Sequence, residues 1–334
     1  MEATEIINLI EEEKITLLNA THFNSDFTAN ELQNIKNALI TNSSVEVIEL
    51  ENIEIKNDIW QLLSESLALN NSIKSFKINN IKNLDNDFSA LEEIIIFSTS
   101  IEELIIANHI NSGNDVLNAI GYAISTNTNL KRLVLTNNNL KGSSIDCVSQ
   151  IINMNNTIID INISYQEINS KHLKIIADGL KNNKTLISLS LNNVGLDHTS
   201  LKALTKGMIE NNSLTTLNLT HNNLTYITVK PLVELLKVSH LLENINLNNN
   251  QLDPYFAAEF GKTFDINRQI KLIDLSDNNL LDLGVTMIAR YAQKLDSLTT
   301  LNLANNNITD IGIYLVEDAL KSVGKPDNFY LILT

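Results

Sequence analysis

A repeat of about 28 residues runs along almost the whole chain and constrains its fold more than any other feature. The strongest copies are LKRLVLTNNNL from Leu130, LTTLNLTHNNL from Leu214, LENINLNNNQL from Leu242, IKLIDLSDNNL from Ile270 and LTTLNLANNNI from Leu298. Weaker copies begin at Ile15, Val45, Ile73, Ile101, Ile158 and Leu186. Successive copies start 28 to 30 residues apart, a register that chance does not hold. A repeat of this length indicates supersecondary units that stack on one another.

Each copy is expected to form a short strand followed by a helix. The strand alternates apolar and polar residues, as in Leu301–Leu303. The second half has helical spacing, and in Asp310–Lys321 the apolar face is expected to hold Ile311, Leu315, Ala319 and Leu320. Neither element can bury its apolar residues alone. Stacked copies therefore predict a parallel sheet on the inside and a row of helices on the outside.

The pattern L-x-x-L-x-L-x-x-N-x-L, kept in the five strong copies, resembles the leucine-rich repeat, and its length resembles the ribonuclease-inhibitor-like subclass. The resemblance implies an α/β leucine-rich-repeat solenoid, or horseshoe, with a parallel β-sheet on the concave face and α-helices on the convex face. It covers residues 15–334, about eleven units plus a final strand at Phe329–Leu333. Ribonuclease inhibitor is rich in cysteine, whereas this chain has a single cysteine.

Residues 1–14 precede the first copy and read as an amphipathic helix. Its apolar residues are Ile6, Ile7, Leu9 and Ile10. They would cover the exposed end of the first repeat, as a terminal cap of a repeat array must. We therefore expect an N-terminal capping helix at 1–14 and repeats over 15–334.

The asparagine of the pattern is kept in only part of the array. It occurs at Asn138, Asn222, Asn250, Asn278 and Asn306, while the other copies carry Phe23, Ile53, Ile81, His109, Gln166 and Val194. A buried amide at this position is expected to bond neighbouring backbone groups. Because apolar residues cannot do so, we expect the N-terminal repeats to be less regular, with Ile73–Ser100 the least ideal.

The chain is acidic, with a formal net charge of −15. Twelve acidic residues and three lysines fall within the first sixty positions. This charge argues against nucleic acid and against an electrostatic membrane anchor as partners. It serves solubility, or it steers a basic partner toward the N-terminal end. No apolar run is long enough to span a membrane and no signal peptide is visible, so we expect a protein that is cytoplasmic or delivered into a host cell.

Residues that could carry chemistry are sparse. The six histidines form no metal-spaced pair, and no glycine-rich phosphate loop occurs. Cys147 could act as the nucleophile of a ligase, but equivalent positions in other copies are mostly apolar, so a small core hydrophobe is the favoured interpretation. We therefore expect no catalytic residue, no metal, no cofactor and no small-molecule substrate.

Alternation predicts that the third, fifth and seventh residues of each copy point away from the helices, with the eighth at the rim. The fifth residues are Asn19, Glu49, Lys77, Ile105, Val134, Asn162, Ser190, Asn218, Asn246, Asp274 and Asn302. The eighth are His22, Asn52, Asn80, Asn108, Asn137, Tyr165, Asn193, His221, Asn249, Asp277 and Asn305. These mostly small polar residues hold adjacent strands in register, or they offer hydrogen bonds to a protein.

Ile105 and Val134 interrupt the polar columns on adjacent strands. Glu103 and Arg132 lie beside them, and Tyr165 lies one strand further on. An exposed apolar pair flanked by arginine and tyrosine is the composition of a binding hot spot. These five residues are therefore the predicted partner-binding site, although two exposed aliphatic residues can also occur without a function.

The sequence favours a non-catalytic module that binds a folded protein. The chain is rich in Asn and Ile, as proteins from AT-rich genomes are, and its repeats are of the eukaryotic length. In this it looks like the leucine-rich-repeat effectors of intracellular bacteria, which would make the partner a host protein. A regulatory leucine-rich-repeat protein of an AT-rich protist is the alternative, and a cysteine-dependent ligase is a third.

Overall fold

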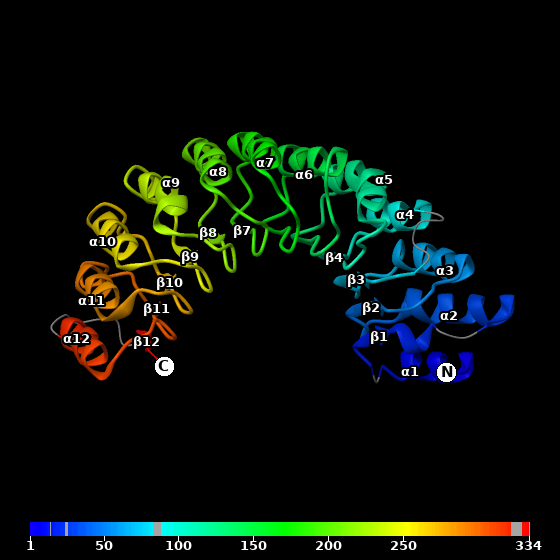
Figure 1. Ribbon diagram of the computed structural model, residues 1–334. Coiled ribbons are helices and arrows are strands. Elements are labelled where there is room, and N and C mark those ends of the chain that lie inside the picture. The colour runs from blue at the N-terminus through cyan, green and yellow to red at the C-terminus, as the bar shows by residue number, and fades with distance from the viewer. Residues whose placement is uncertain (14, 24–25, 83–87, 322–328, 334) are drawn as a thin grey trace. The chain divides into compact units, whose positions relative to one another are not determined.

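The computed structural model describes residues 1–13, 15–23, 26–82, 88–321 and 329–333. The chain forms two compact units, Met1–Ile163 and Ser164–Thr334. In each unit strands and helices alternate along the chain, and the helices cover one face of the strands (Figure 1). The predicted strand–helix repeat is thereby confirmed.

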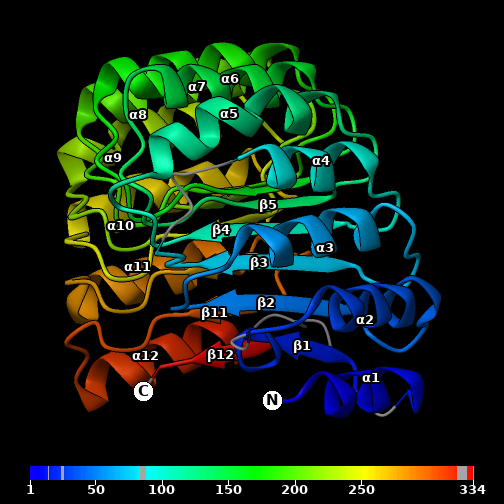
Figure 2. The same ribbon diagram turned by 90° about the vertical axis from the view of Figure 1, so that its right-hand side faces the viewer.

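The first unit contains six parallel strands that neighbour one another in chain order. They are β1 (Leu17–Asn19), β2 (Val47–Glu51), β3 (Ser75–Asn79), β4 (Glu103–Ala107), β5 (Arg132–Val134) and β6 (Asp160–Asn162). Figure 2 shows β2 to β5 lying side by side. The register sets Glu103 opposite Arg132, and Arg132 opposite Asp160. Residues one repeat apart therefore stand next to each other on the sheet.

Six helices of the first unit pack outside these strands. They are α1 (Ala3–Glu11), α2 (Ala29–Thr41), α3 (Asn57–Leu67), α4 (Ser89–Phe97), α5 (Gly113–Thr126) and α6 (Ser143–Met154), with a short 3-10 helix at Ala20–His22. Helix α1 forms within the segment expected to be amphipathic, and it buries Ala3, Ile6 and Ile10. The Asn42 side chain donates to the Ile10 carbonyl at 2.7 Å, which ties α1 to the turn after α2.

The second unit repeats this arrangement. Its strands are β7 (Ser188–Ser190), β8 (Thr216–Asn218), β9 (Asn244–Asn246), β10 (Leu272–Asp274), β11 (Thr300–Asn302) and β12 (Tyr330–Ile332). Its helices are α7 (Ser170–Asn182), α8 (His198–Glu210), α9 (Tyr226–Leu236), α10 (Pro254–Lys262), α11 (Leu281–Ala292) and α12 (Asp310–Lys321), with a 3-10 helix at Thr263–Asp265. Strand β12 confirms the final strand expected at Phe329–Leu333.

The fourth and sixth residues of each repeat form the core between strands and helices. Residues such as Leu217 and Leu219 are completely buried, whereas Thr216 and Asn218 on either side of Leu217 are only half-buried. This alternation divides the sheet into a face covered by helices and a second face, here called the open face, that carries the third and fifth residues.

The expected packing of α12 is partly wrong. Leu320 is buried as expected, but Ile311 is 69% exposed, and Gly312 and Val316 are buried in its place. The helix is rotated so that Gly312 meets α11. Apolar residues at positions 311 and 315 fit helical spacing equally well, so the face that packs is set by the neighbouring helix.

Proline lies inside α9 and frees one carbonyl. Pro231 is the sixth residue of this helix, which begins at Tyr226. Since proline has no N–H, the Ile227 carbonyl loses its helical partner. Nδ1 of His198, at the start of α8, lies 3.1 Å from that oxygen and replaces the missing donor. Among the described helices, none has both the length and the apolarity needed to cross a bilayer.

Candidate functional site

The pattern asparagines form a buried ladder, here called the first asparagine ladder. Asn222 donates through Nδ2 to the Leu191 and Leu219 carbonyls at 2.8 and 3.0 Å, and its Oδ1 accepts from Val194 N at 3.0 Å. The expected backbone role is confirmed. His109 does part of the same work, because its Nε2 accepts from Ile81 N at 3.2 Å.

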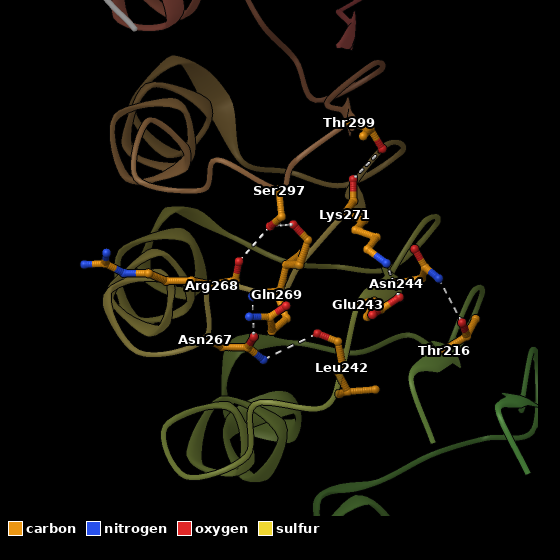
Figure 3. Close-up of polar contacts among 11 residues, drawn as sticks. Thr216, Leu242, Glu243, Asn244, Asn267, Arg268, Gln269, Lys271, Ser297 and Thr299 are labelled. Carbon is orange, nitrogen blue, oxygen red and sulfur yellow. Dashed lines mark hydrogen bonds and ion pairs between the residues drawn. The ribbon is translucent and has the colours of Figure 1, made fainter. Parts of the chain in front are cut away.

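A second asparagine ladder, which the repeat pattern did not predict, lies at the turns from helix to strand. Its members stand three residues before a repeat begins: Asn42, Asn70, Asn127, Asn155, Asn183, Asn211 and Asn267. Asn211 donates to the Leu180 and Asn183 carbonyls at 2.8 and 2.9 Å and accepts from Ser213 N and Leu214 N at 2.9 and 2.8 Å. Asn267 is the member drawn in Figure 3, where its amide donates to the Leu242 carbonyl. It also donates to the Ser239 carbonyl of the preceding repeat, at 3.2 Å. The constant spacing was a signal in the sequence.

On the open face of the second unit, small polar side chains bond mainly to one another. Asn244 donates to Thr216 at 2.9 Å across neighbouring strands (Figure 3). Thr220 donates to Asn246, and Asn302 donates to Ser276. These contacts favour the interpretation that the polar columns hold strands in register. They leave few donors and acceptors there for a ligand.

The open face of the first unit carries charge. Arg132 on β5 lies between Glu103 on β4 and Asp160 on β6, with Arg132 Nε 2.8 Å from an Asp160 oxygen and its Nη1 2.5 Å from a Glu103 oxygen. The Ser75 hydroxyl donates to the other Glu103 oxygen. These four residues are here called the Arg132 cluster. They link four adjacent strands, and the arginine remains about half exposed at 47%.

The structure corrects the apolar part of the predicted site. Val134 was expected to be exposed, but it is only 6% exposed, and Ile105 is half-buried. Val134 is short, and strands about 4.8 Å apart let longer neighbours cover it. Glu103 and Arg132 are brought together as expected. Tyr165 belongs to the second unit. Asp160, which pairs with Arg132, was not among the predicted site residues.

The pKa of Glu103 falls below its ordinary value. Partial burial acts to raise this pKa, but hydrogen bonds from Ser75 and Arg132 and the charges of Arg132 and Lys77 together outweigh it. A depressed pKa means that the stabilisation is present above the unfolded-state pKa and is lost as pH falls through the folded-state pKa.

We therefore expect Glu103→Gln to lower the free energy of unfolding by about 1 kcal/mol at pH 7. The difference from wild type should shrink as pH falls below about 4.3, the ordinary pKa of glutamate, because the carboxylate of the unfolded chain takes up a proton there, while that of the folded protein stays ionised to a lower pH. Urea unfolding at pH 7, 5 and 4 measures both values. A difference that is constant over this range would show that the charge of Glu103 contributes nothing.

The eighth residue of each repeat adopts the left-handed backbone conformation from the second repeat onward. The φ values lie between 49° and 61° at Asn52, Asn80, Asn108, Asn137, Tyr165, Asn193, His221, Asn249, Asp277 and Asn305. Asparagine, aspartate and histidine are the non-glycine residues that tolerate this region best. The composition of the column thus follows from its backbone, and Tyr165 is the exception, with its ring 54% exposed.

Replacing Tyr165 with asparagine should raise the free energy of unfolding by about 1 kcal/mol, because it relieves a left-handed tyrosine. Tyr165→Ala is the matched control, since alanine tolerates the conformation no better and should give no gain. Urea unfolding of the three proteins provides the comparison. Equal stability of the asparagine and alanine variants would contradict the strain.

Cys147 has the properties of a packed thiol. It lies in α6 and is half-buried, and its Sγ is 3.7 Å from Asn118 Oδ1. Burial and the neighbouring charge of Asp146 raise its pKa. A raised pKa disfavours the thiolate that a nucleophile needs.

Comparison with known proteins agrees with this fold. The Leucine Rich Repeat family matches residues 213–235 and 297–318. The solved structure of LegL7, a leucine-rich repeat-containing protein from Legionella pneumophila, is 17% identical with a TM-score of 0.52, and the match covers 86% of this chain and 94% of that chain. The sequence matches none of the curated proteins with which it was compared.

Two further solved structures match shorter stretches. The tropomodulin C-terminal domain of Caenorhabditis elegans is 14% identical with a TM-score of 0.39, covering 46% of this chain and 92% of that chain. Actin-binding site 2 of leiomodin-1 is 21% identical with a TM-score of 0.39, covering 46% and 87%.

The repeat pattern, the alternating strands and helices and the shared fold of LegL7 make this chain a leucine-rich-repeat protein. Leucine-rich repeats suggest a protein-interaction module.

Proposed function

We propose that the chain binds a folded protein and catalyses no reaction itself, and that each unit contributes its own anchor residue: the exposed guanidinium of Arg132 in the first unit and Tyr165 in the second. The observation that carries the proposal is the backbone of Tyr165. An exposed aromatic ring stands there in a conformation that asparagine, histidine or aspartate adopts in the other repeats. Strain of this kind persists when function requires it. Tyrosine and arginine are also the residues most enriched at binding hot spots.

The Arg132 cluster positions its arginine for such a role. The two carboxylates hold the guanidinium in one orientation, so little side-chain freedom is lost when a partner binds. Because both carboxylates are already paired, the partner is expected to contact the exposed edge of the guanidinium or stack on its plane. Ile105 and the buried Val134 contribute packing beneath this surface rather than an exposed apolar pair.

The experiment compares wild type with Tyr165→Ala and Arg132→Ala for partner affinity and for melting temperature. Each substitution should weaken binding by on the order of 2 kcal/mol. Melting of Tyr165→Ala should be unchanged, while Arg132→Ala loses its ion pairs and should melt slightly earlier. The matched control is Tyr122→Ala, which removes another exposed tyrosine, on α5. Unchanged affinity in both variants would move the site elsewhere, for example to the acidic rim of Glu46, Glu49, Glu51 and Glu54.

We propose further that the partner is a host protein met by a bacterial effector. The asparagine- and isoleucine-rich composition together with repeats of eukaryotic length supports this proposal. Co-purification from eukaryotic cell lysate tests it, with Tyr165→Ala as the non-binding control. A partner captured equally by both proteins, or captured only from bacterial lysate, would contradict it.

A further inference from the structure

A row of exposed apolar side chains crosses the starts of four consecutive helices in the second unit. Ile227 on α9, Tyr255 on α10, Leu283 on α11 and Ile311 on α12 are 71%, 74%, 59% and 69% exposed. They stand 28 residues apart, so they occupy the same place in each repeat. This set is here called the apolar stripe. Scattered exposed apolar residues are ordinary, but an aligned set of this kind indicates an interaction surface.

The helix starts that carry the stripe are packed against one another. A Cβ atom added at Gly284 would lie 3.3 Å from Pro254 Cα, and one added at Gly312 would lie 2.1 Å from an Asp282 carboxylate oxygen. That carboxylate also accepts hydrogen bonds from the Thr309 backbone and hydroxyl. The first turns of α10, α11 and α12 (Figure 1) are therefore in direct contact, and each carries one stripe residue at the same place in its repeat.

Leu281 extends the row at a cost to stability. Equivalent positions in this unit hold residues whose side chains cap helices, namely Asn169, Asp197, Thr225 and Asp253. Leu281 cannot cap a helix, its φ is 56°, and its side chain is 42% exposed. Two unfavourable features thus accompany an exposed leucine two residues before Leu283. A role in binding accounts for both.

The charges beside the stripe on α10, α11 and α12 are negative, whereas on α9 the exposed Lys230 lies three residues after Ile227. No lysine or arginine occurs from Leu242 to Gly261, from Leu272 to Ala289 or from Leu295 to Leu320. Asp253, Asp282 and Asp310 lie at the starts of the three helices, where each offsets the positive end of a helix dipole. An occupant with positive charge on either side of its apolar residues fits this surface.

We propose that the apolar stripe binds an amphipathic, basic α-helix of a protein partner. Helices in contact lie about 8–10 Å apart, so successive stripe residues repeat at about that distance. A partner helix rises about 10.5 Å in seven residues and returns to nearly the same face, which places one apolar residue against each repeat. A β-strand places same-face residues only about 6.8 Å apart and drifts out of phase. A polyproline helix matches the spacing, but the surfaces that read it are lined by aromatic rings, and the stripe has one.

The test uses a fluorescent peptide of about 21 residues with leucine at the first and fourth positions of each heptad and lysine, glutamine and alanine elsewhere, long enough to span about 31 Å as a helix. Fluorescence anisotropy measures its binding to wild type, to Tyr255→Ser/Leu283→Ser and to Leu281→Asp. The matched control is Tyr122→Ser/Ile209→Ser, which removes apolar side chains of similar exposure outside the stripe. Leu281→Asp places a residue that tolerates a positive φ better than leucine at the first residue of α11, so it should melt no earlier than wild type, and lost binding cannot be ascribed to misfolding.

We expect the peptide to bind wild type. The stripe substitutions should weaken this binding about tenfold or more, and the control substitutions should leave it unchanged. Arg132→Ala and Tyr165→Ala should bind the peptide as wild type does, so this surface and the proposed open-face site succeed or fail separately. Four outcomes would overturn the proposal. The first is that the peptide does not bind. The second and third are that a scrambled or polyproline peptide, or a peptide with glutamate in place of lysine, binds equally well. The fourth is that the protein does not bind the peptide but sediments with phosphatidylcholine vesicles in a way that depends on the stripe.

Discussion

Asn211→Ala should lower the free energy of unfolding by about 4 kcal/mol or more. The Asn211 side chain is buried, and it makes four hydrogen bonds of 2.8 to 2.9 Å to backbone groups. Its removal leaves two carbonyls and two N–H groups without partners, and each buried group that stays unsatisfied costs about 1–3 kcal/mol. Water that enters the space recovers part of this sum.

Asn212→Ala provides the control, because this neighbouring asparagine is exposed. Its effect should stay within about 0.5 kcal/mol. Urea unfolding of both variants measures the difference. Similar stability of the two would mean that water replaces the amide at no cost and that the second asparagine ladder is dispensable.

Gly207→Ala should also destabilise the protein, by about 3 kcal/mol, although the same change usually stabilises a helix interior by about 1 kcal/mol. A Cβ atom at this position of α8 would lie 2.4 Å from the Ala177 carbonyl oxygen and 2.9 Å from its carbonyl carbon. These are backbone atoms of α7 and cannot rotate away. The two helices would have to separate, which opens the packing between two repeats.

Gly121→Ala is the comparison, since it also lies within a helix but its added Cβ would meet only the Cys147 side chain, at 3.1 and 3.2 Å. The Sγ atom can rotate away and the Cβ atom has to move by only a few tenths of an ångström, so the effect should be smaller than at Gly207. Thermal melting of the two variants separates the cases. Equal shifts in melting temperature would sink the argument from close backbone approach.

The strand–helix alternation could be predicted from the sequence because the repeat period fixes it. Buried positions of the strands follow from alternation alone, as Leu217 and Leu219 show. Side-chain exposure on the open face could not be obtained in this way. Val134 has the right phase to point outward, but its burial depends on neighbours from other repeats.

Helix faces were harder to predict for a related reason. Ile311 fits the helical spacing of an inward face, yet the close approach at Gly312 turns it outward. The exposure of the apolar stripe therefore depends on packing between repeats, and the spacing of apolar residues within one repeat does not predict that packing. The second asparagine ladder was visible as a column three residues before each start, but it lies outside the pattern that defines the repeat.

Both asparagine ladders reach in one direction. Asn222 and Asn211 each donate to carbonyls of the repeat before their own, 31 residues earlier in the chain. Each repeat therefore carries the amides that donate to backbone carbonyls of the preceding repeat, and its own carbonyls accept from the amides of the following repeat. When such a unit is copied within a gene, the new copy arrives with the amides needed to join it to the unit before it. Arrays built in this way can lengthen by duplication without a compensating change elsewhere.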